Sequence, residues 1–180
     1  MVPVLQKARE VIDHIMDVNF LLTSKLYTVI HLSRYTMSFK PLGVILMPYA
    51  RVGGYLKVLP SIISKVQTDG SFRYGSYARI AAILGTKKRM IPIEAHSSTE
   101  TEWASVALGL ELALENNETV IGIENDNMSV IVDLSRPTML KHAYARHYKN
   151  EIQRLAADTA WTGVRWIPRA LNRADGLFRV

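Results

Sequence analysis

The order in which strand-like and helix-like segments follow one another from Lys65 onward most constrains the fold of this chain. Three short segments with strand composition come first, at residues 65–71, 77–84 and 89–96. A helical segment, a buried strand at 119–124, two more helices, a strand at 163–168 and a helical stub follow. We expect the first three strands to form an antiparallel meander. The last two should run parallel to the first strand, because each follows a helical crossover.

The helical segments carry apolar residues at spacings of three and four. The first begins in the polar run 97–101, where Thr99 and Glu102 have the spacing of a capping box, and it ends near Asn116. The later helices are expected at 127–135 and 141–160, and the stub at 173–179. The residues Gly85-Thr86-Lys87-Lys88 are a plausible hairpin connection between the second and third strands.

The first 64 residues have a different character from the rest. A helix is expected from about Val4 to Arg34, and proline and glycine interrupt residues 35–64. We therefore divide the chain into an N-terminal extension of unknown role, residues 1–64, and a domain formed by residues 65–180. The extension holds seven Lys and Arg against three Asp and Glu, whereas the domain holds fifteen against thirteen. The net charge of +6 suits an acidic polymer such as nucleic acid as partner.

Several classes of protein are disfavoured by composition. There is no cysteine, which excludes a disulfide framework and thiolate metal sites and is compatible with a reducing compartment. No apolar stretch approaches the roughly 20 residues of a membrane span. Acidic residues interrupt the N-terminus early, unlike a secretory signal. We therefore expect an intracellular protein that is neither secreted nor bound to a membrane.

Four acidic residues stand at the starts and ends of the expected elements. They are Asp69 near the end of the first strand, Glu102 in the first helical turn, Asp126 after the fourth strand and Asp175 in the final stub. Two carboxylates about 4 Å apart repel by roughly 4 kcal/mol at an effective dielectric constant near 20. Such a cluster persists mainly where divalent cations neutralise it, and hard oxygen ligands suit magnesium.

Each acid also has a simpler interpretation. Asp126 could cap the following helix, Asp69 could start a turn, and Glu102 could interact favourably with the helix dipole. Glu124, two residues before Asp126 on the same strand face, is the most plausible substitute ligand. The spacing of Glu111 and Glu115 favours solvent exposure on the helix surface.

Four motifs occur in order on the expected elements. They are Thr68-Asp69-Gly70-Ser71, Thr101-Glu102-Trp103-Ala104 with the helix that follows, the strand end at Asp126, and Trp166-Ile167-Pro168-Arg169 leading to Asn172-Arg173-Ala174-Asp175. On these motifs, residues from about 65 to 180 resemble the ribonuclease H family. The resemblance is strongest to the branch found in plant-type proteins and fused to retroelement reverse transcriptases.

This resemblance implies an α/β fold with a five-stranded mixed sheet and helices on both faces. It also implies a two-metal endonuclease that hydrolyses the RNA strand of RNA–DNA hybrids. Asp69, Glu102, Asp126 and Asp175 match the family's catalytic carboxylates and would hold two Mg²⁺ ions, for which Mn²⁺ can substitute. The residues expected to contact the substrate are Gly70, Ser71, Ser98, Thr99, Arg169 and Asn172.

The chain departs from the family pattern near its C-terminus. The loop 169–172 lacks the histidine that many members carry before the last carboxylate, and the last motif is one residue shorter than the commoner form. Two alternatives to a ribonuclease H therefore stay open: a nucleic-acid-binding module of the same fold without turnover, and a DNA-acting nuclease or recombinase. The partner could also include other parts of a reverse transcriptase or polyprotein.

Overall fold

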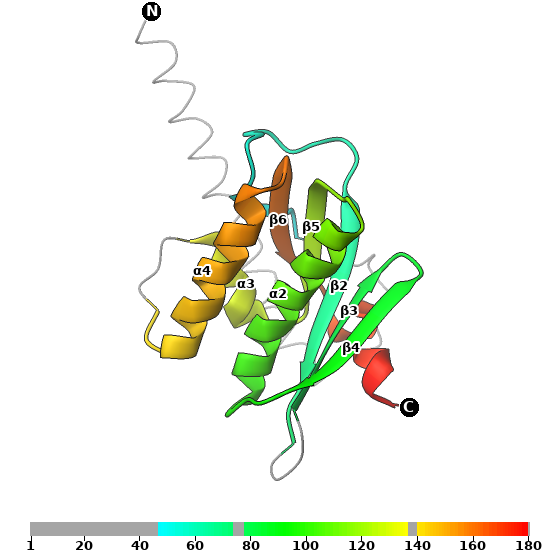
Figure 1. Ribbon diagram of the computed structural model, residues 1–180, viewed down its shortest axis with the longest axis vertical. Helices are drawn as coiled ribbons and strands as arrows, with labels where there is room; N and C mark the ends of the chain where they lie inside the picture. Colours follow the sequence, from blue (N-terminus) through cyan, green and yellow to red (C-terminus); the bar gives the residue numbers. More distant parts are fainter. Residues whose placement is uncertain (1–46, 74–77, 137–139, 180) are drawn as a thin grey trace, which may run out of the picture. The chain divides into compact units, whose positions relative to one another are not determined.

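The computed structural model of the protein describes residues 47–73, 78–136 and 140–179. These residues belong to one compact unit that runs from Leu46 to Val180 (Figure 1). The helix predicted from about Val4 to Arg34 lies outside the described residues. None of the helices within those ranges is long and apolar enough to cross a membrane.

A mixed sheet of six strands is the centre of the described unit (Figure 1). The strands are β1 (Ala50–Gly53), β2 (Ser64–Ser71), β3 (Ala78–Leu84), β4 (Lys87–Ile93), β5 (Val120–Asn125) and β6 (Trp161–Trp166). Their order across the sheet is β1-β6-β5-β2-β3-β4. The pairs β2–β3 and β3–β4 are antiparallel, and β5 runs parallel to both β2 and β6. The predicted meander and parallel crossovers are confirmed, and β2 lies inside the sheet.

The sixth strand, β1, corrects the prediction of five strands. It pairs antiparallel with β6, so that Ala50 lies opposite Val164. The sequence analysis missed it because the strand is only four residues long and ends at Gly53, in a segment rich in turn residues. The sheet therefore takes one strand from the segment that we assigned to the N-terminal extension.

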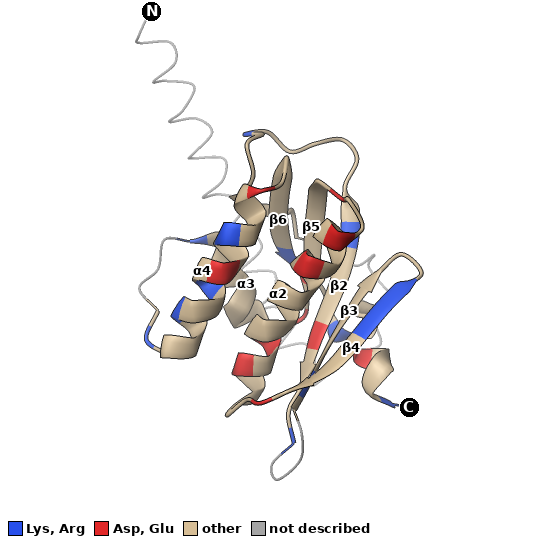
Figure 2. Cartoon of the chain, viewed as in Figure 1, with Lys and Arg blue, Asp and Glu red and all other residues tan. Residues whose placement is uncertain are grey.

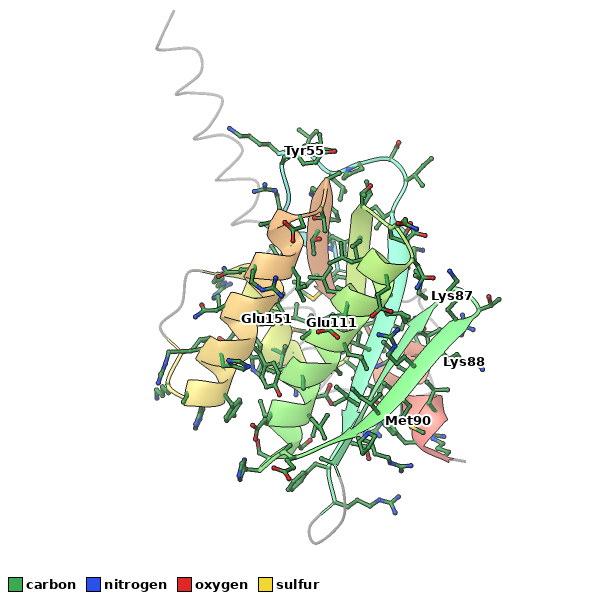
Figure 3. All side chains as sticks on the ribbon, viewed as in Figure 1. Tyr55, Lys87, Lys88, Met90, Glu111 and Glu151 are labelled. Atoms are coloured by element: carbon green, nitrogen blue, oxygen red, sulfur yellow. The ribbon has the colours of Figure 1, made fainter. Side chains whose placement is uncertain are left out.

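The hairpin between β3 and β4 is tighter than expected. Leu84 pairs with Lys87, which leaves Gly85 and Thr86 as the two-residue turn. Gly85 has a φ of 61°, which a residue without a Cβ adopts easily. Because the turn is short, Lys87 and Lys88 belong to the edge strand β4, where Figure 2 shows a basic stretch and Figure 3 labels both side chains. Exposed lysines and Pro92 protect such an edge from pairing with another strand.

Three helices belong to the described unit: α2 (Ser98–Glu115), α3 (Met128–Ser135) and α4 (Ala143–Ala157). Figure 1 shows α2 and α4 side by side on one face of the sheet. Trp103 and Leu110 of α2 are fully buried with Val66 of β2 and Ile123 of β5 in the main core. Helix α4 is shorter than the predicted 141–160, and Trp161 already belongs to β6.

The opposite face of the sheet has a smaller cover near the C-terminus. A 3₁₀ helix, η3 (Asp175–Arg179), takes the place of the helical stub expected at 173–179, and a shorter one, η2 (Arg169–Leu171), precedes it. Ala81 and Ile83 of β3 pack there with Ala174 in a second buried cluster, against which Leu177 and Phe178 lie. This packing places the start of η3 behind the middle of the sheet, close to β2.

Candidate metal centre

Asp69 lies on a strand that has hydrogen-bonded neighbours on both sides. It pairs with Ala81 of β3, and residues 64–67 of the same strand pair with β5. Only 4% of Asp69 is exposed. Its Oδ1 accepts a hydrogen bond from the Gly70 amide at 2.9 Å. An interior strand holds its backbone firmly, and a metal ligand needs that accuracy of position.

Glu102 is directed to the same place by α2, although the acidic residue in the first turn of this helix is Glu100 and not, as predicted, Glu102. The helix is capped by Ser97, whose Oγ accepts from the Glu100 amide at 3.1 Å, so the predicted pairing of Thr99 with Glu102 is wrong. The Glu100 carboxylate accepts from the His96 amide at 2.7 Å. Capping therefore occupies Glu100 and leaves Glu102, 7% exposed, for another role.

Gly70 explains how this turn comes so close to β2. A Cβ at Gly70 would lie 2.7 Å from the Glu102 nitrogen, a distance that real side chains do not reach. The missing side chain thus lets the helix start pack directly on the strand that carries Asp69. We expected Gly70 to admit the substrate backbone, and that contact stays a prediction.

Asp126 follows the last residue of β5. The residue that caps α3 is Asn127, whose Oδ1 accepts from the Ser129 and Val130 amides, so Asp126 is not the cap. Instead its Oδ1 accepts from Nδ2 of Asn172 at 3.2 Å, and its backbone oxygen accepts from the Trp166 indole at 2.8 Å. Both bonds leave the second carboxylate oxygen available to a ligand.

The carboxylates of Asp69, Glu102 and Asp126 converge. One oxygen from each lies within 4.8 Å of the others, a spacing at which a single cation can bind all three. Among the described residues, none of the three forms an ion pair with Lys or Arg. The donor set is all oxygen, as Mg²⁺ and Mn²⁺ prefer.

The pKa values of the three carboxyl groups reflect their burial without a paired cation. Burial raises the pKa of Asp69 to about 7, and the charges of Asp126 and Asp175 add to the shift. Burial, followed by the Asp69 charge, raises the pKa of Glu102 to about 9. Burial also raises the pKa of Asp126. A divalent cation would offset the negative charge of these three carboxylates, and its binding would release protons.

Asp175 lies near this group but is held differently. It is 5% exposed at the start of η3, and its two oxygens form ion pairs with Arg169 and Arg179. Burial opposes its ionisation, but the hydrogen bonds from the two arginines outweigh burial, and the pKa of Asp175 is lowered. The structure therefore brings three of the four predicted ligands together and places the fourth beside them as the partner of two arginines.

The other predicted contacts differ in accessibility. Ser98 is exposed at the start of α2, whereas Ser71 and Thr99 are half-buried. The side chain of Arg169 is 75% exposed even though it pairs with Asp175. Asn172 is only 4% exposed, and its amide donates to Asp126 and, at 2.9 Å, to the Thr68 carbonyl. Its substrate contact stays a prediction, while its visible contacts position Asp126.

Sequence reasoning missed Asn125, which has no exposed surface. Its Nδ2 lies 3.0 Å from the Glu102 carboxylate and 3.1 Å from the Thr68 carbonyl, and its Oδ1 accepts from the Asn127 amide at 2.7 Å. Asn125 thus links α2, β2 and the start of α3 around the three carboxylates. An amide that follows Glu124 at the end of a buried strand was the signal that could have revealed it.

Glu124, the suggested substitute ligand, is engaged elsewhere. It forms an ion pair with Arg165 and accepts hydrogen bonds from Gln67 and Tyr49. Burial opposes its ionisation, but the bonds from Arg165, Gln67 and Tyr49 together lower the pKa of Glu124. Glu111 and Glu115 are exposed on α2, as predicted, and Figure 3 shows Glu111 on the outer side of that helix.

Comparison with solved structures supports the fold. A ribonuclease H1 from the archaeon Halobacterium salinarum is 22% identical with a TM-score of 0.57, and the match covers 63% of this chain and 92% of that one. The N-terminal ribonuclease H domain of a Mycobacterium tuberculosis protein gives 22% identity and a TM-score of 0.59, covering 65% and 91%. LC11-RNase H1, solved in complex with an RNA/DNA hybrid, gives 18% and 0.56, covering 63% and 91%.

A search of curated protein sequences gave no match to this chain. The family model described as "reverse transcriptase-like" does match, over residues 68–175, which begin just before Asp69 and end at Asp175. This span is more than half of the 180 residues. The resemblance to ribonuclease H that the four motifs suggested is thereby confirmed, and the chain belongs to the reverse transcriptase-like family of ribonuclease H-like domains.

Proposed function

We propose that the protein is a metal-dependent endonuclease that hydrolyses the RNA strand of RNA–DNA hybrids. One observation carries the proposal: carboxylates from β2, from α2 and from the end of β5 converge within 4.8 Å, and in the described part of the chain none of them forms an ion pair with Lys or Arg. A cluster of buried negative charge is costly without cations, and phosphodiester hydrolysis by two metals is a chemistry that uses such a cluster.

The residues present fit divalent cations of the Mg²⁺ type. Asp69, Glu102 and Asp126 would hold the metal through their facing oxygens, and Asp175 would join them once it leaves its arginines. When bound, two such ions activate a water molecule and stabilise the leaving oxygen of the phosphodiester. Asn125 and Asn172 keep Glu102 and Asp126 in place by hydrogen bonds to their carboxylates.

Arg169 is the residue best placed to bind the substrate's phosphate. Its guanidinium pairs with Asp175, yet its side chain is 75% exposed. A guanidinium binds phosphate oxygens in a bidentate manner. We infer that a phosphate at the centre competes with Asp175 for Arg169, so that substrate binding frees Asp175 for the metal. Ser98 and Thr99 at the start of α2, with Ser71, would hydrogen-bond the 2′-hydroxyl groups that distinguish RNA.

A cleavage assay with separately labelled strands tests the proposal. RNA–DNA hybrid, duplex RNA and duplex DNA are incubated with Mg²⁺, Mn²⁺ or EDTA. We expect cleavage of the RNA strand of the hybrid with either metal and no cleavage in EDTA. Asp69→Asn should abolish it, while Glu111→Gln, which changes an exposed carboxylate of α2, should not. Cleavage of duplex DNA instead would assign the protein to the DNA-acting enzymes of the same fold.

The alternative of a binding module without turnover is favoured by one observation. Both oxygens of Asp175 are paired with arginines, which compete with metal ions for this carboxylate. Under that alternative the protein would bind the hybrid with a steep salt dependence and release no product with any metal. A filter-binding titration over 50 to 200 mM salt beside the cleavage assay separates the two readings.

A further inference from the structure

A second polar network lies within β2, β5 and β6, close to the metal centre but not part of it. At its middle is the Glu124 carboxylate, whose side chain is 5% exposed. Its Oε1 accepts from Tyr49 at 2.9 Å and from Nε of Arg165 at 3.0 Å, and its Oε2 accepts from Gln67 at 3.0 Å. Three donors from three separate segments thus converge on one buried acid.

Gln67 connects this network to the loop that carries the last motif. Its Nε2 also donates to the Leu171 carbonyl at 3.0 Å, and its Oε1 accepts from the Arg173 amide at 3.2 Å. These two backbone groups flank Asn172, whose side chain holds Asp126 and whose Oδ1 accepts from the Ala174 amide at 3.2 Å. The Gln67 side chain therefore clamps the loop on both sides of Asn172.

Tyr49 connects the same network to the segment ahead of the family motifs. Its ring lies under the Arg165 guanidinium, 4.4 Å from Cζ to the centroid, and makes an edge contact with Trp161 at 6.0 Å. Gly122 of β5 makes room for it, because a Cβ there would lie 2.6 Å from Cζ of Tyr49. The tyrosine is therefore built into the sheet face and bonds to Glu124 from outside residues 68–175.

We propose that Tyr49, Glu124 and Gln67 form a positioning relay, through which the segment ahead of the family motifs fixes the loop 171–174 and thereby Asp126. The relay consists of hydrogen bonds in series, from the Tyr49 hydroxyl to Glu124, from Gln67 to Glu124, and from Gln67 to the loop backbone. Tyr49 and Gln67 do not touch the metal in this proposal; they act through Asn172. The effect of the relay on catalysis rests on the proposed function, whereas the relay itself does not depend on that function.

The test uses the full chain and four variants. Tyr49→Phe keeps the ring and removes only the hydroxyl, and Gln67→Met keeps the length of the side chain and removes its hydrogen bonds. The third variant combines both changes. Tyr55→Phe is the matched control, because this tyrosine is 74% exposed. Three quantities are measured: hydrogen exchange of the Arg173 and Ala174 amides by NMR without substrate, the dissociation constant for Mn²⁺ by calorimetry, and kcat and KM on the hybrid.

We expect Gln67→Met to speed exchange of both amides and to weaken Mn²⁺ binding by about tenfold, since it removes more than one hydrogen bond. Tyr49→Phe should change both quantities in the same direction by about threefold. The double variant should match Gln67→Met, because both changes break one series of bonds. Where the enzyme is active, kcat should fall while KM stays constant. Tyr55→Phe should behave as the wild type.

Two results would overturn the relay. One is wild-type exchange at Arg173 and Ala174 in Tyr49→Phe. The other is a double variant whose effect is the product of the two single effects, which would mean that Tyr49 and Gln67 act independently. The amide measurement needs neither metal nor hydrolysis. If the wild type cleaves nothing but the amides respond as expected, the relay is supported and only the proposed function fails.

Discussion

The described part of the molecule contains two sets of buried carboxylates, and their charges are compensated in opposite ways. The first set is Asp69, Glu102 and Asp126, which face one another and form no ion pair with Lys or Arg among the residues that the structure describes. The second set is Glu124 and Asp175, each paired with arginine. Burial does not separate them, because Asp69 and Glu124 are both 4% exposed. What differs is the charge of their neighbours.

This difference separates structural acids from candidate metal ligands. The arginines and other donors lower the pKa of Glu124 and of Asp175 despite burial. Burial, reinforced by the charges of neighbouring acids, raises the pKa of Asp69 to about 7 and that of Glu102 to about 9. The charge of a paired acid is compensated within the protein, whereas an unpaired cluster needs a cation from solution. The comparison thus selects the site without reference to any motif.

The largest expected effect is on catalysis. Asp69→Asn should lower the hydrolysis rate by at least about 10³-fold, because several kcal/mol of metal-dependent charge stabilisation are lost with the ligand. The rate is measured in single-turnover conditions with saturating Mg²⁺. The matched change in the other set, Glu124→Gln, keeps a side chain of the same length outside the metal pocket and should reduce the rate far less. Equal losses in the two variants would abolish the distinction between the sets.

Stability should respond in the reverse order. Glu124→Leu should lower the free energy of unfolding by about 3 kcal/mol, since it leaves the half-buried Arg165 without its partner. Asp69→Asn should raise it by on the order of 1 kcal/mol at pH 8 in EDTA, because it removes an unpaired buried charge. Urea unfolding measures both. Glu115→Gln, at an exposed ion pair with Arg89, serves as control and should leave the free energy of unfolding almost unchanged, because water screens this pair.

The two sets also predict how stability depends on pH. The pKa of Asp69 rises from 3.8 to about 7 on folding and that of Glu102 from 4.5 to about 9. Their stabilising contribution is therefore complete below about pH 4 and is lost as the pH rises through 7 and then 9. Asp175 and Glu124, with lowered pKa values, contribute above about pH 4 and lose their contribution as the pH falls below it.

Thermal unfolding from pH 4 to 9 in EDTA should accordingly show a Tm that declines from about pH 5 to about pH 9, because the folded state keeps protons that the unfolded state has already lost. Saturating Mn²⁺ should flatten this decline, because the metal binds the ionised carboxylates. In Asp69→Asn the decline below about pH 7 should become shallower, because only Glu102 then contributes to it. A Tm that rises with pH over this range in EDTA would mean that cations in the protein already neutralise the cluster.

Much of this arrangement could be predicted from the sequence. The strand and helix order placed Asp69, Glu102 and Asp126 at element ends, and the parallel pairing of β2 with β5 brings two of those ends to the same edge. The order of strands and helices can be predicted from local patterns, because the alternation of apolar residues in strands and their spacing in helices involve residues close in sequence. The structure was needed to show that Asp126 does not cap the helix α3, because the cap is Asn127.

What could not be predicted depends on contacts between distant segments. Strand β1 is too short for a pattern, and its pairing with β6 joins residues more than a hundred positions apart. Gln67 reads as an ordinary strand residue, yet its partners are Glu124, Leu171 and Arg173. The two arginines on Asp175 likewise come from either side of it along the chain. A polar side chain without a motif reveals its partner only in three dimensions.

The smallest expected effect concerns Arg179, which pairs with Asp175 from four residues along the chain. Two effects oppose each other when it is replaced by glutamine. The loss of an ion pair whose arginine is 75% exposed should cost less than about 1 kcal/mol of stability, because water screens it. Asp175, however, loses one of the two cations that compete with the metal. We therefore expect Arg179→Gln to tighten Mn²⁺ binding by about two- to fivefold in calorimetry while Tm hardly changes. Weaker binding would instead show that Arg179 orients Asp175 toward the metal, and Asp175 would then belong with the three facing acids.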